Sequence, residues 1–201
     1  MAKCAFIGLG IMGYPMAGHL QAKGHDVTVY NRTAAKAEKW VAEHGGSAAA
    51  TPREAAEGAA FVMACVGNDD DIRGIAYGDD GLFAGIPDSA TFVDHTTASA
   101  DIAREIESYA KDNGKNFIDA PVSGGQAGAE NGVLTVMCGG DQAVFDAAKP
   151  VIDSYSRAVT LLGAAGAGQL TKMVNQICIA GLVQGLAEGI HFAEKAGLDI
   201  P

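Results

Sequence analysis

The chain has 201 residues, of which 48% are hydrophobic and 19% charged, a composition typical of one large or two small globular domains and not of a disordered chain. Its net charge of −10 argues against a nucleic-acid partner, because proteins that bind nucleic acids usually carry excess positive charge. The four cysteines are widely spaced and form neither a metal-ligand pattern nor a disulfide framework, so we expect reduced thiols and a cytoplasmic protein.

Short apolar runs alternate with alanine-rich, charged segments as far as about residue 160. The first run is too short and too broken by glycines for a signal peptide. The runs predict strands at Cys4–Gly8, Asp26–Tyr30, Phe61–Val66, Thr91–Asp94, Asn116–Asp119, Val133–Cys138 and Ala158–Leu161. Helical spacing between them predicts helices at Pro15–Lys23, Thr33–His44, Ser99–Asp112 and Gln142–Ser154. This alternation predicts an α/β fold with a largely parallel sheet that is buried on both faces.

The pattern changes after Leu162, where a joint of small residues precedes one long predicted helix, Gln169–Ala196. Between Met173 and Ala187 this helix is apolar on nearly every side, unlike a surface helix. Polar residues interrupt it, so we expect no membrane span and no membrane partner. An exposed apolar helix rarely stays uncovered, so we expect either further residues or a second subunit of a homo-oligomer to cover it.

Three glycines on this helix recur at every fourth residue, at Gly181, Gly185 and Gly189. That spacing favours close packing of another helix. The alternative is a loose helix sequence, because each glycine weakens a helix by about 1 kcal/mol.

A glycine-rich turn follows the first predicted strand and opens a helix. It reads Gly8, Leu9, Gly10, Ile11, Met12 and Gly13, which is the pattern G-x-G-x-x-G. In this context the first glycine permits a tight turn, the second lets the backbone approach a pyrophosphate, and the third lets helix and strand pack closely. The free N–H groups of the helix would face the phosphates. The pattern therefore predicts a dinucleotide site, and a glycine turn without a ligand is the alternative.

The second predicted strand ends at Asn31, Arg32 and Thr33, where such sites read the adenine ribose. Sites that prefer NAD place a carboxylate here, whereas this chain has a neutral Asn31 and the guanidinium of Arg32, which suits a phosphate. Lys36, one turn further on, would add positive charge. These residues favour NADP, with NAD also possible; a merely solvated Arg32 is the alternative.

Four segments, in order, resemble the β-hydroxyacid dehydrogenase family, which includes 3-hydroxyisobutyrate dehydrogenases, tartronate semialdehyde reductases and glyoxylate/succinic semialdehyde reductases. They are Phe6–Ala17, Val93–Ser99, Asp119–Gly125 and Gly168–Gln176. The resemblance implies a Rossmann-type, doubly wound domain over residues 1–163 and a long interdomain helix over 164–201 that begins an all-helical C-terminal domain. Members of the family are typically longer, so we expect this chain to be a fragment that is inactive on its own.

The resemblance assigns proton transfer to the lysine of a K-x-x-N pattern, here Lys172, with Asn175 on the same helix face. Lys172 would donate a proton in carbonyl reduction and accept one in alcohol oxidation. Desolvation beside an apolar helix surface lowers a lysine pKa, which suits that role. Without the resemblance, a solvated lysine in the first turn of a helix is the simpler interpretation.

Two further groups of residues complete the predicted site. Ser123, Gly124 and Gly125 follow a strand end, where α/β sheets bind ligands, and their hydroxyl and backbone N–H groups could hold a substrate carboxylate. A plain tight turn is the alternative for this segment. The resemblance places the loop Val66, Gly67 and Asn68, and also Thr97, along the nicotinamide half of the cofactor.

Two features invite a catalytic or metal interpretation that we set aside. The acidic run Asp69–Asp71 is interpreted as a solvated helix start, where carboxylates interact favourably with the helix dipole. No cluster of His, Cys and acidic residues has metal-ligand spacing, so we expect no metal. For His95 a structural role is favoured over a catalytic one.

The sequence thus predicts an NADP(H)-dependent oxidoreductase that moves hydride between nicotinamide and a short hydroxy acid or semialdehyde, with a small carboxylic acid as substrate. The alternatives are an NAD-dependent 3-hydroxyisobutyrate dehydrogenase and a non-catalytic NADP-binding module. The 6-phosphogluconate dehydrogenases rank lower, because their K-x-x-H-N pattern has a histidine that the segment from Lys172 to Asn175 lacks. Imine reductases rank lower because they usually lack the lysine.

Overall fold

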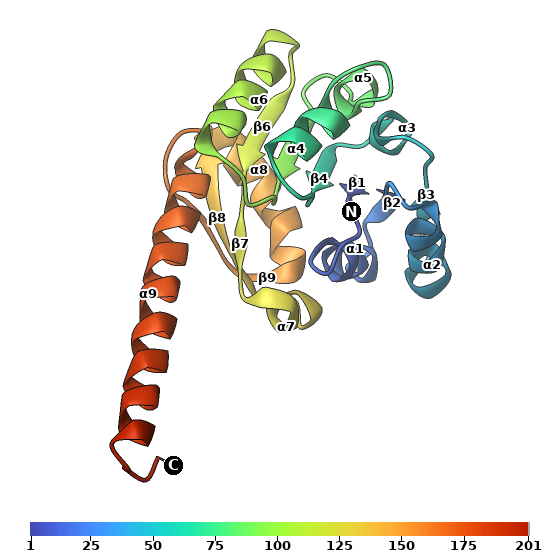
Figure 1. Ribbon diagram of the computed structural model, residues 1–201. Helices are drawn as coiled ribbons and strands as arrows, with labels where there is room; N and C mark the ends of the chain where they lie inside the picture. Colours follow the sequence, from blue (N-terminus) through green and yellow to red (C-terminus); the bar gives the residue numbers. More distant parts are fainter. Residues whose placement is uncertain (201) are drawn as a thin grey trace.

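The computed structural model describes residues 1–200 and builds them around one mixed sheet, with a long helix, α9, running away from it (Figure 1). The strand order is β3-β2-β1-β4-β5-β6-β8-β7, with β9 beside β8. Neighbouring strands from β3 to β6 are parallel, β8 is antiparallel to β6 and β7, and β9 is parallel to β8. The strands are β1 (Lys3–Ile7), β2 (Asp26–Tyr30), β3 (Ser47–Ala48), β4 (Phe61–Ala64), β5 (Thr91–Asp94), β6 (Asn116–Asp119), β7 (Val122–Ser123), β8 (Leu134–Gly140) and β9 (Ser156–Leu161).

Helices cover both faces of the sheet. They are α1 (Gly13–Ala22), α2 (Ala34–His44), α3 (Pro52–Ala56), α4 (Asp69–Ala76), α5 (Leu82–Gly85), α6 (Ala100–Asp112), α7 (Gly125–Glu130), α8 (Gln142–Ile152) and α9 (Ala167–Lys195), with a 3₁₀ turn at Asp153–Tyr155. Side chains of β1 alternate between two buried clusters, with Cys4 and Phe6 in one and Ala5 and Ile7 in the other. The first cluster includes α1, α2 and α8, and the second includes α3 to α6. A sheet buried on both faces explains why its strands are apolar without alternation.

The predicted α/β, doubly wound, largely parallel fold is confirmed. The strands predicted at Asp26–Tyr30, Thr91–Asp94 and Asn116–Asp119 match β2, β5 and β6 residue for residue, and the other four predicted strands differ only at their ends. The sequence did not predict β3, β7, α3, α5 or α7, each of which has six residues or fewer. Elements this short contain too few residues for a helical or strand period to be recognised.

The long predicted helix is α9, and its start packs against β6, β8 and α6 while the rest extends beyond the sheet (Figure 1). Most of its large apolar side chains are exposed in this chain, among them Val174, Ile177, Leu182, Val183, Leu186 and Phe192. A Cβ atom added at Gly181, Gly185 or Gly189 would meet open space. The glycine face is thus available to another helix but unpaired in the described chain.

The inference that polar residues make α9 too polar to cross a membrane is wrong. By length and composition it is long and apolar enough to cross a membrane, with a mean hydropathy of 1.2. Its polar residues, such as Asn175 and Gln184, are too few to offset the leucines, isoleucines and valines around them. The core helix of a soluble protein satisfies the same criterion, so this composition alone is weak support for a membrane span.

Candidate functional site

A cavity of about 820 Å³ opens at the carboxyl ends of β1, β2 and β4. This is the edge at which parallel α/β sheets bind ligands, because the loops that follow the strands meet there. The cavity is lined by most of the predicted cofactor residues, namely Gly8, Gly10, Ile11, Met12, Asn31, Arg32, Thr33, Lys36, Val66 and Gly67. Three segments that are distant in the sequence therefore converge on one cavity, as the dinucleotide hypothesis requires.

The glycine turn has the geometry expected of a phosphate-binding loop. Gly8 has a φ of +94°, and a Cβ there would overlap the carbonyl of Cys65, which directly follows the neighbouring strand β4. A Cβ at Gly13 would overlap the Gly8 carbonyl, so only glycine lets α1 approach β1 this closely. Gly10 has open space around it, and no side chain caps the start of α1. The turn therefore offers uncapped backbone amides to the cavity, and these residues fit a pyrophosphate.

Leu9, which lies outside the cavity lining, and Asn31, which is part of it, connect the two loops. The Leu9 side chain is buried, and its backbone N–H donates to the Asn31 Oδ1 at 2.9 Å. The Asn31 amide in turn donates to the carbonyl oxygen of Thr33 at 3.1 Å. Asn31 therefore holds the glycine turn against the end of β2, a role that its neutrality alone did not indicate.

Arg32 and Lys36 are exposed at the cavity, where they can meet an anion. The Arg32 side chain is 89% exposed, and its Nη1 lies 3.5 Å from the Asp71 Oδ1 on the opposite wall. The cavity also contains the Cys65 thiol, but burial raises its pKa to about 12. That thiol stays protonated at neutral pH and is therefore a poor nucleophile.

Thr96, which was not predicted as a site residue, joins the two loops that were predicted to contact the nicotinamide. The Val66 N–H donates to the Thr96 Oγ1 at 3.0 Å, which links the end of β4 to the end of β5. Thr97 is exposed beside this link but lies outside the cavity lining. Asn68 also lies outside it, and its side chain caps α4 by accepting from the Asp71 N–H at 3.0 Å.

His95 has the structural role that the sequence favoured. It is 1% exposed, with Nδ1 2.7 Å from the Ala120 carbonyl oxygen and Nε2 2.7 Å from the Tyr155 hydroxyl. Because a carbonyl can only accept, Nδ1 carries the proton and Nε2 accepts from Tyr155. Burial lowers the pKa of His95 to about 4, so the ring is neutral at physiological pH. It fixes the backbone just before the Ser123 segment.

The start of α9 is held by two buried polar side chains. The Asp119 carboxylate, at the end of β6, accepts from the Gly166 N–H at 2.7 Å and from the Gln169 N–H at 2.9 Å. The Gln169 side chain accepts from the Ala98 N–H at 3.0 Å and donates to the Thr96 carbonyl at 2.7 Å. The first turn of α9 is thus fixed to the ends of β5 and β6, which sets the position of Lys172 one turn later.

The predicted substrate residues are placed at this end of the sheet but outside the cavity lining. Lys172 is half-buried, and burial lowers its pKa, as expected beside an apolar helix surface. The Asn175 side-chain amide donates to the Oε1 of its neighbour Gln176 at 3.1 Å. Ser123 is half-buried in β7, while Gly124, with a φ of +133°, and Gly125 are exposed at the start of α7. The predicted loop is therefore a short strand and a helix start.

The acidic run does begin a helix, but its residues are not all solvated. Asp69 accepts from both the N–H and the hydroxyl of Ser99, and this lowers the pKa of the Asp69 carboxyl. The expectation of a simply solvated helix start is therefore wrong for Asp69. Over residues 1–200, no group of three or more His, Cys, Asp or Glu side chains is arranged to hold a metal.

Two buried carboxylates, Asp94 and Asp119, are paired across β5 and β6. Burial raises the pKa of Asp94 to about 7, against the Thr96 N–H that favours its ionised form. The native state thus binds this proton more tightly than the unfolded chain, where an aspartate titrates near about 3.9. The resulting stabilisation is complete below about pH 4 and is lost as the pH rises through about 7.

We therefore expect the free energy of unfolding to be higher at pH 5 than at pH 8, by about 2 kcal/mol from this group. The variant Asp94→Asn should remove that difference, since its Oδ1 can still accept from Thr96. Denaturant unfolding at the two pH values measures it, with the exposed Asp101→Asn as control. An unchanged pH dependence in Asp94→Asn would contradict the assignment.

Comparisons with known proteins agree with this geometry. A family model described as the NAD binding domain of 6-phosphogluconate dehydrogenase matches residues 3–163. An uncharacterized oxidoreductase of Shewanella frigidimarina is 67% identical, with 99% of this chain and 68% of the relative covered. A probable 3-hydroxyisobutyrate dehydrogenase-like protein of Arabidopsis thaliana is 43% identical, with 98% of this chain and 65% of the relative covered.

A solved structure of 3-hydroxyisobutyrate dehydrogenase from Mycobacterium tuberculosis with L-serine superposes with a TM-score of 0.92 at 35% identity, covering 99% of this chain and 67% of that one. The chain thus spans about two thirds of the length of these relatives. The family predicted from four sequence segments is confirmed. The chain belongs to the 6-phosphogluconate dehydrogenase/β-hydroxyacid dehydrogenase family and contains its NAD(P)-binding domain.

Proposed function

We propose that the full-length protein is an NADP(H)-dependent oxidoreductase that transfers hydride between nicotinamide and a short hydroxy acid or semialdehyde. The observation that carries this proposal is the cavity formed by the glycine turn, with Arg32 and Lys36 exposed beside the end of β2. A bound nicotinamide supplies or takes up the hydride. The chain contributes the nucleotide cradle and the residues at the start of α9.

The choice of NADP rests on the charges at the ribose end. The end of β2 presents the neutral Asn31, whose side chain is already bonded to Leu9 and Thr33. Arg32 beside it offers two-pronged hydrogen bonding to a 2′-phosphate, and Lys36 adds a second cation. An adenine ribose without a phosphate would leave both cations without a partner on the ligand.

The proposed chemistry places Lys172 at the substrate oxygen and Ser123, Gly124 and Gly125 at its carboxylate. A lysine whose pKa is lowered by burial exchanges a proton more readily near neutral pH than a solvated one. Asn175, one turn along, would orient the same oxygen. Two of the similar proteins support a hydroxy-acid substrate by their names, and one of them was solved with L-serine, which carries a hydroxyl on its β carbon.

An NAD-dependent 3-hydroxyisobutyrate dehydrogenase is the second candidate. The Asp71 carboxylate near Arg32 favours it, because an acidic group at the ribose end repels a 2′-phosphate. We also propose a cytoplasmic location and a homo-oligomer, in which the exposed apolar side chains of α9 would be covered.

Titration of this chain with NADPH and, separately, with NADH tests the cofactor assignment by calorimetry or nucleotide fluorescence. Wild type should bind NADPH more tightly. Arg32→Asp should weaken NADPH binding by about 10- to 100-fold, the worth of a charge-assisted hydrogen bond, and should spare NADH. The exposed Arg104→Asp on α6, which lies outside the cavity, is the matched control. An unchanged ratio of the two affinities in Arg32→Asp would refute the proposed 2′-phosphate site.

A further inference from the structure

A carboxylate faces Arg32 from the opposite wall of the cavity. Arg32 follows β2, whereas Asp71 lies in the first turn of α4, after β4, and both line the cavity. The Arg32 Nη1 and the Asp71 Oδ1 are 3.5 Å apart. An anion that binds the guanidinium of Arg32 in this position therefore lies near this carboxylate.

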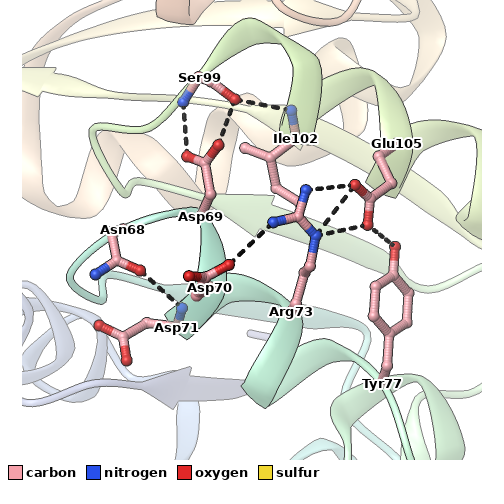
Figure 2. A network of polar contacts seen from close by, with 9 residues as sticks. All are labelled: Asn68, Asp69, Asp70, Asp71, Arg73, Tyr77, Ser99, Ile102 and Glu105. Atoms are coloured by element: carbon pink, nitrogen blue, oxygen red, sulfur yellow. Dashed lines mark hydrogen bonds and ion pairs between the residues drawn. The ribbon is translucent and has the colours of Figure 1, made fainter.

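The position of Asp71 is fixed by the anchoring of α4 (Figure 2). The Asn68 side chain caps the helix at the Asp71 N–H. On the side of α4 that faces α6, Arg73 bonds Glu105, with Nη2 2.7 Å from Oε2, and Tyr77 donates to the same carboxylate at 3.2 Å. Asp69 in the same first turn is bonded to Ser99, the residue that precedes α6. Both the start and the end of α4 are therefore tied to α6.

Asp71 forms its ion pair with Arg32 and not with Arg73 of the same helix. Arg73 is bonded to Asp70 and Glu105, and Figure 2 shows the Asp71 carboxylate pointing away from it. On the other side, a Cβ at Gly67 would overlap the Asp71 Oδ2, so the carboxylate rests over a residue without a side chain. Asp71 is thus directed toward the cavity by backbone capping on one side and a glycine on the other.

We propose that Asp71 is a specificity-determining residue for the nucleotide, which competes with the 2′-phosphate for Arg32 and so moderates the preference for NADPH. This inference rests on the proposed function, in which Arg32 binds that phosphate. Because the Arg32 side chain is 89% exposed and the two charged atoms are 3.5 Å apart, the pair is weak and can be opened by a ligand. The repulsion between the carboxylate and the doubly charged phosphate persists in the complex, whereas a ribose hydroxyl experiences none.

The test is Asp71→Asn in this chain, with the dissociation constants of NADPH and NADH measured by calorimetry. The amide keeps the size of the side chain and removes its charge. NADPH should bind about three- to tenfold more tightly, and NADH should change less than about twofold. The gain for NADPH should shrink as salt is raised from about 0.01 M to about 1 M, because the screening length falls from about 30 Å to about 3 Å.

Asp101→Asn is the matched control. Asp101 is also an acidic residue in the first turn of a helix and is also paired with an arginine, Arg104, but it lies on α6 outside the cavity. It removes the same charge from the protein, so an equal gain for NADPH in Asp101→Asn would show a general charge effect and overturn the inference. Thermal melting of each variant verifies that it is folded.

Two other outcomes separate this inference from the proposed function. If Arg32→Asp weakens NADPH binding but Asp71→Asn leaves the ratio of NADPH affinity to NADH affinity unchanged or lowers it, the cofactor site stands and the role of Asp71 is wrong. If neither substitution changes the ratio, Arg32 does not bind the phosphate and both proposals fail. In an Arg32→Gln background, the gain from Asp71→Asn should be smaller, because the competition for the guanidinium has been removed.

Discussion

Replacing Lys172 by alanine in the full-length protein should lower turnover by about 10²–10⁴-fold and leave the affinity for NADPH nearly unchanged. The loss would reflect one missing proton transfer at the substrate oxygen. The affinity should persist because Lys172 lies outside the cavity that the glycine turn and Arg32 form. Steady-state kinetics with glyoxylate and succinic semialdehyde, together with NADPH titration of the same variant, measure both quantities.

The pH dependence of the wild-type protein gives a second readout of the same residue. Burial lowers the pKa of Lys172, so its amine loses its proton at a lower pH than a solvated lysine does. Carbonyl reduction needs the protonated amine and should decline as the pH rises through that pKa. Alcohol oxidation needs the free amine and should decline as the pH falls through it. In the Lys172→Ala variant, neither reaction should show the decline in activity that depends on this pKa.

Lys195→Ala is the control for Lys172→Ala, because Lys195 is in the last turn of the same helix and far along it from the sheet (Figure 1). We expect its turnover to stay within about twofold of wild type, since surface substitutions away from a site have small effects. Near-normal turnover in Lys172→Ala would rule out its proton-transfer role. A parallel loss in Lys195→Ala would instead point to a general defect of α9.

Local sequence patterns were sufficient to predict the order of the main strands and helices. The alternation of apolar runs and helical segments follows from a sheet that is buried on both faces, and β2 could be predicted to the residue. The glycine turn could also be predicted, because its meaning depends on neighbours in sequence, a strand before it and a helix after it. The short helix α7 could not, because the glycines at its start also fit a loop.

The contacts that position the candidate site were beyond such patterns. Asp119 meets amides 47 and 50 residues away, and Gln169 meets backbone 71 and 73 residues away. Both residues belong to segments that the family resemblance singled out, yet their partners emerge only when β5, β6 and α9 are brought together. The same holds for Asp71, which lies in an acidic run that is an ordinary helix start by composition and faces Arg32 only in the fold.

Asp119→Asn should lower the free energy of unfolding by about 2–4 kcal/mol, the largest stability effect that we expect from a single isosteric change. The carboxylate accepts from two buried amides, one for each oxygen, at Gly166 and Gln169. An asparagine offers one oxygen and one NH₂ group, so one amide would face another donor and lose its partner. Denaturant unfolding of this chain measures the loss, and amide hydrogen exchange at Gly166 and Gln169 localises it.

Asp141→Asn is the matched control, because Asp141 also accepts from two backbone amides at a helix start but is exposed. Both of those amides donate to the same oxygen, Oδ1, which an asparagine also carries, so we expect a loss of about 1 kcal/mol or less. In the full-length protein, Asp119→Asn should also reduce turnover more than NADPH affinity, since Asp119 fixes the turn that precedes Lys172. Equal stability losses in the two variants, with unchanged turnover, would mean that the start of α9 is held by Gln169 and packing, and that the Asp119 carboxylate does not set the position of Lys172.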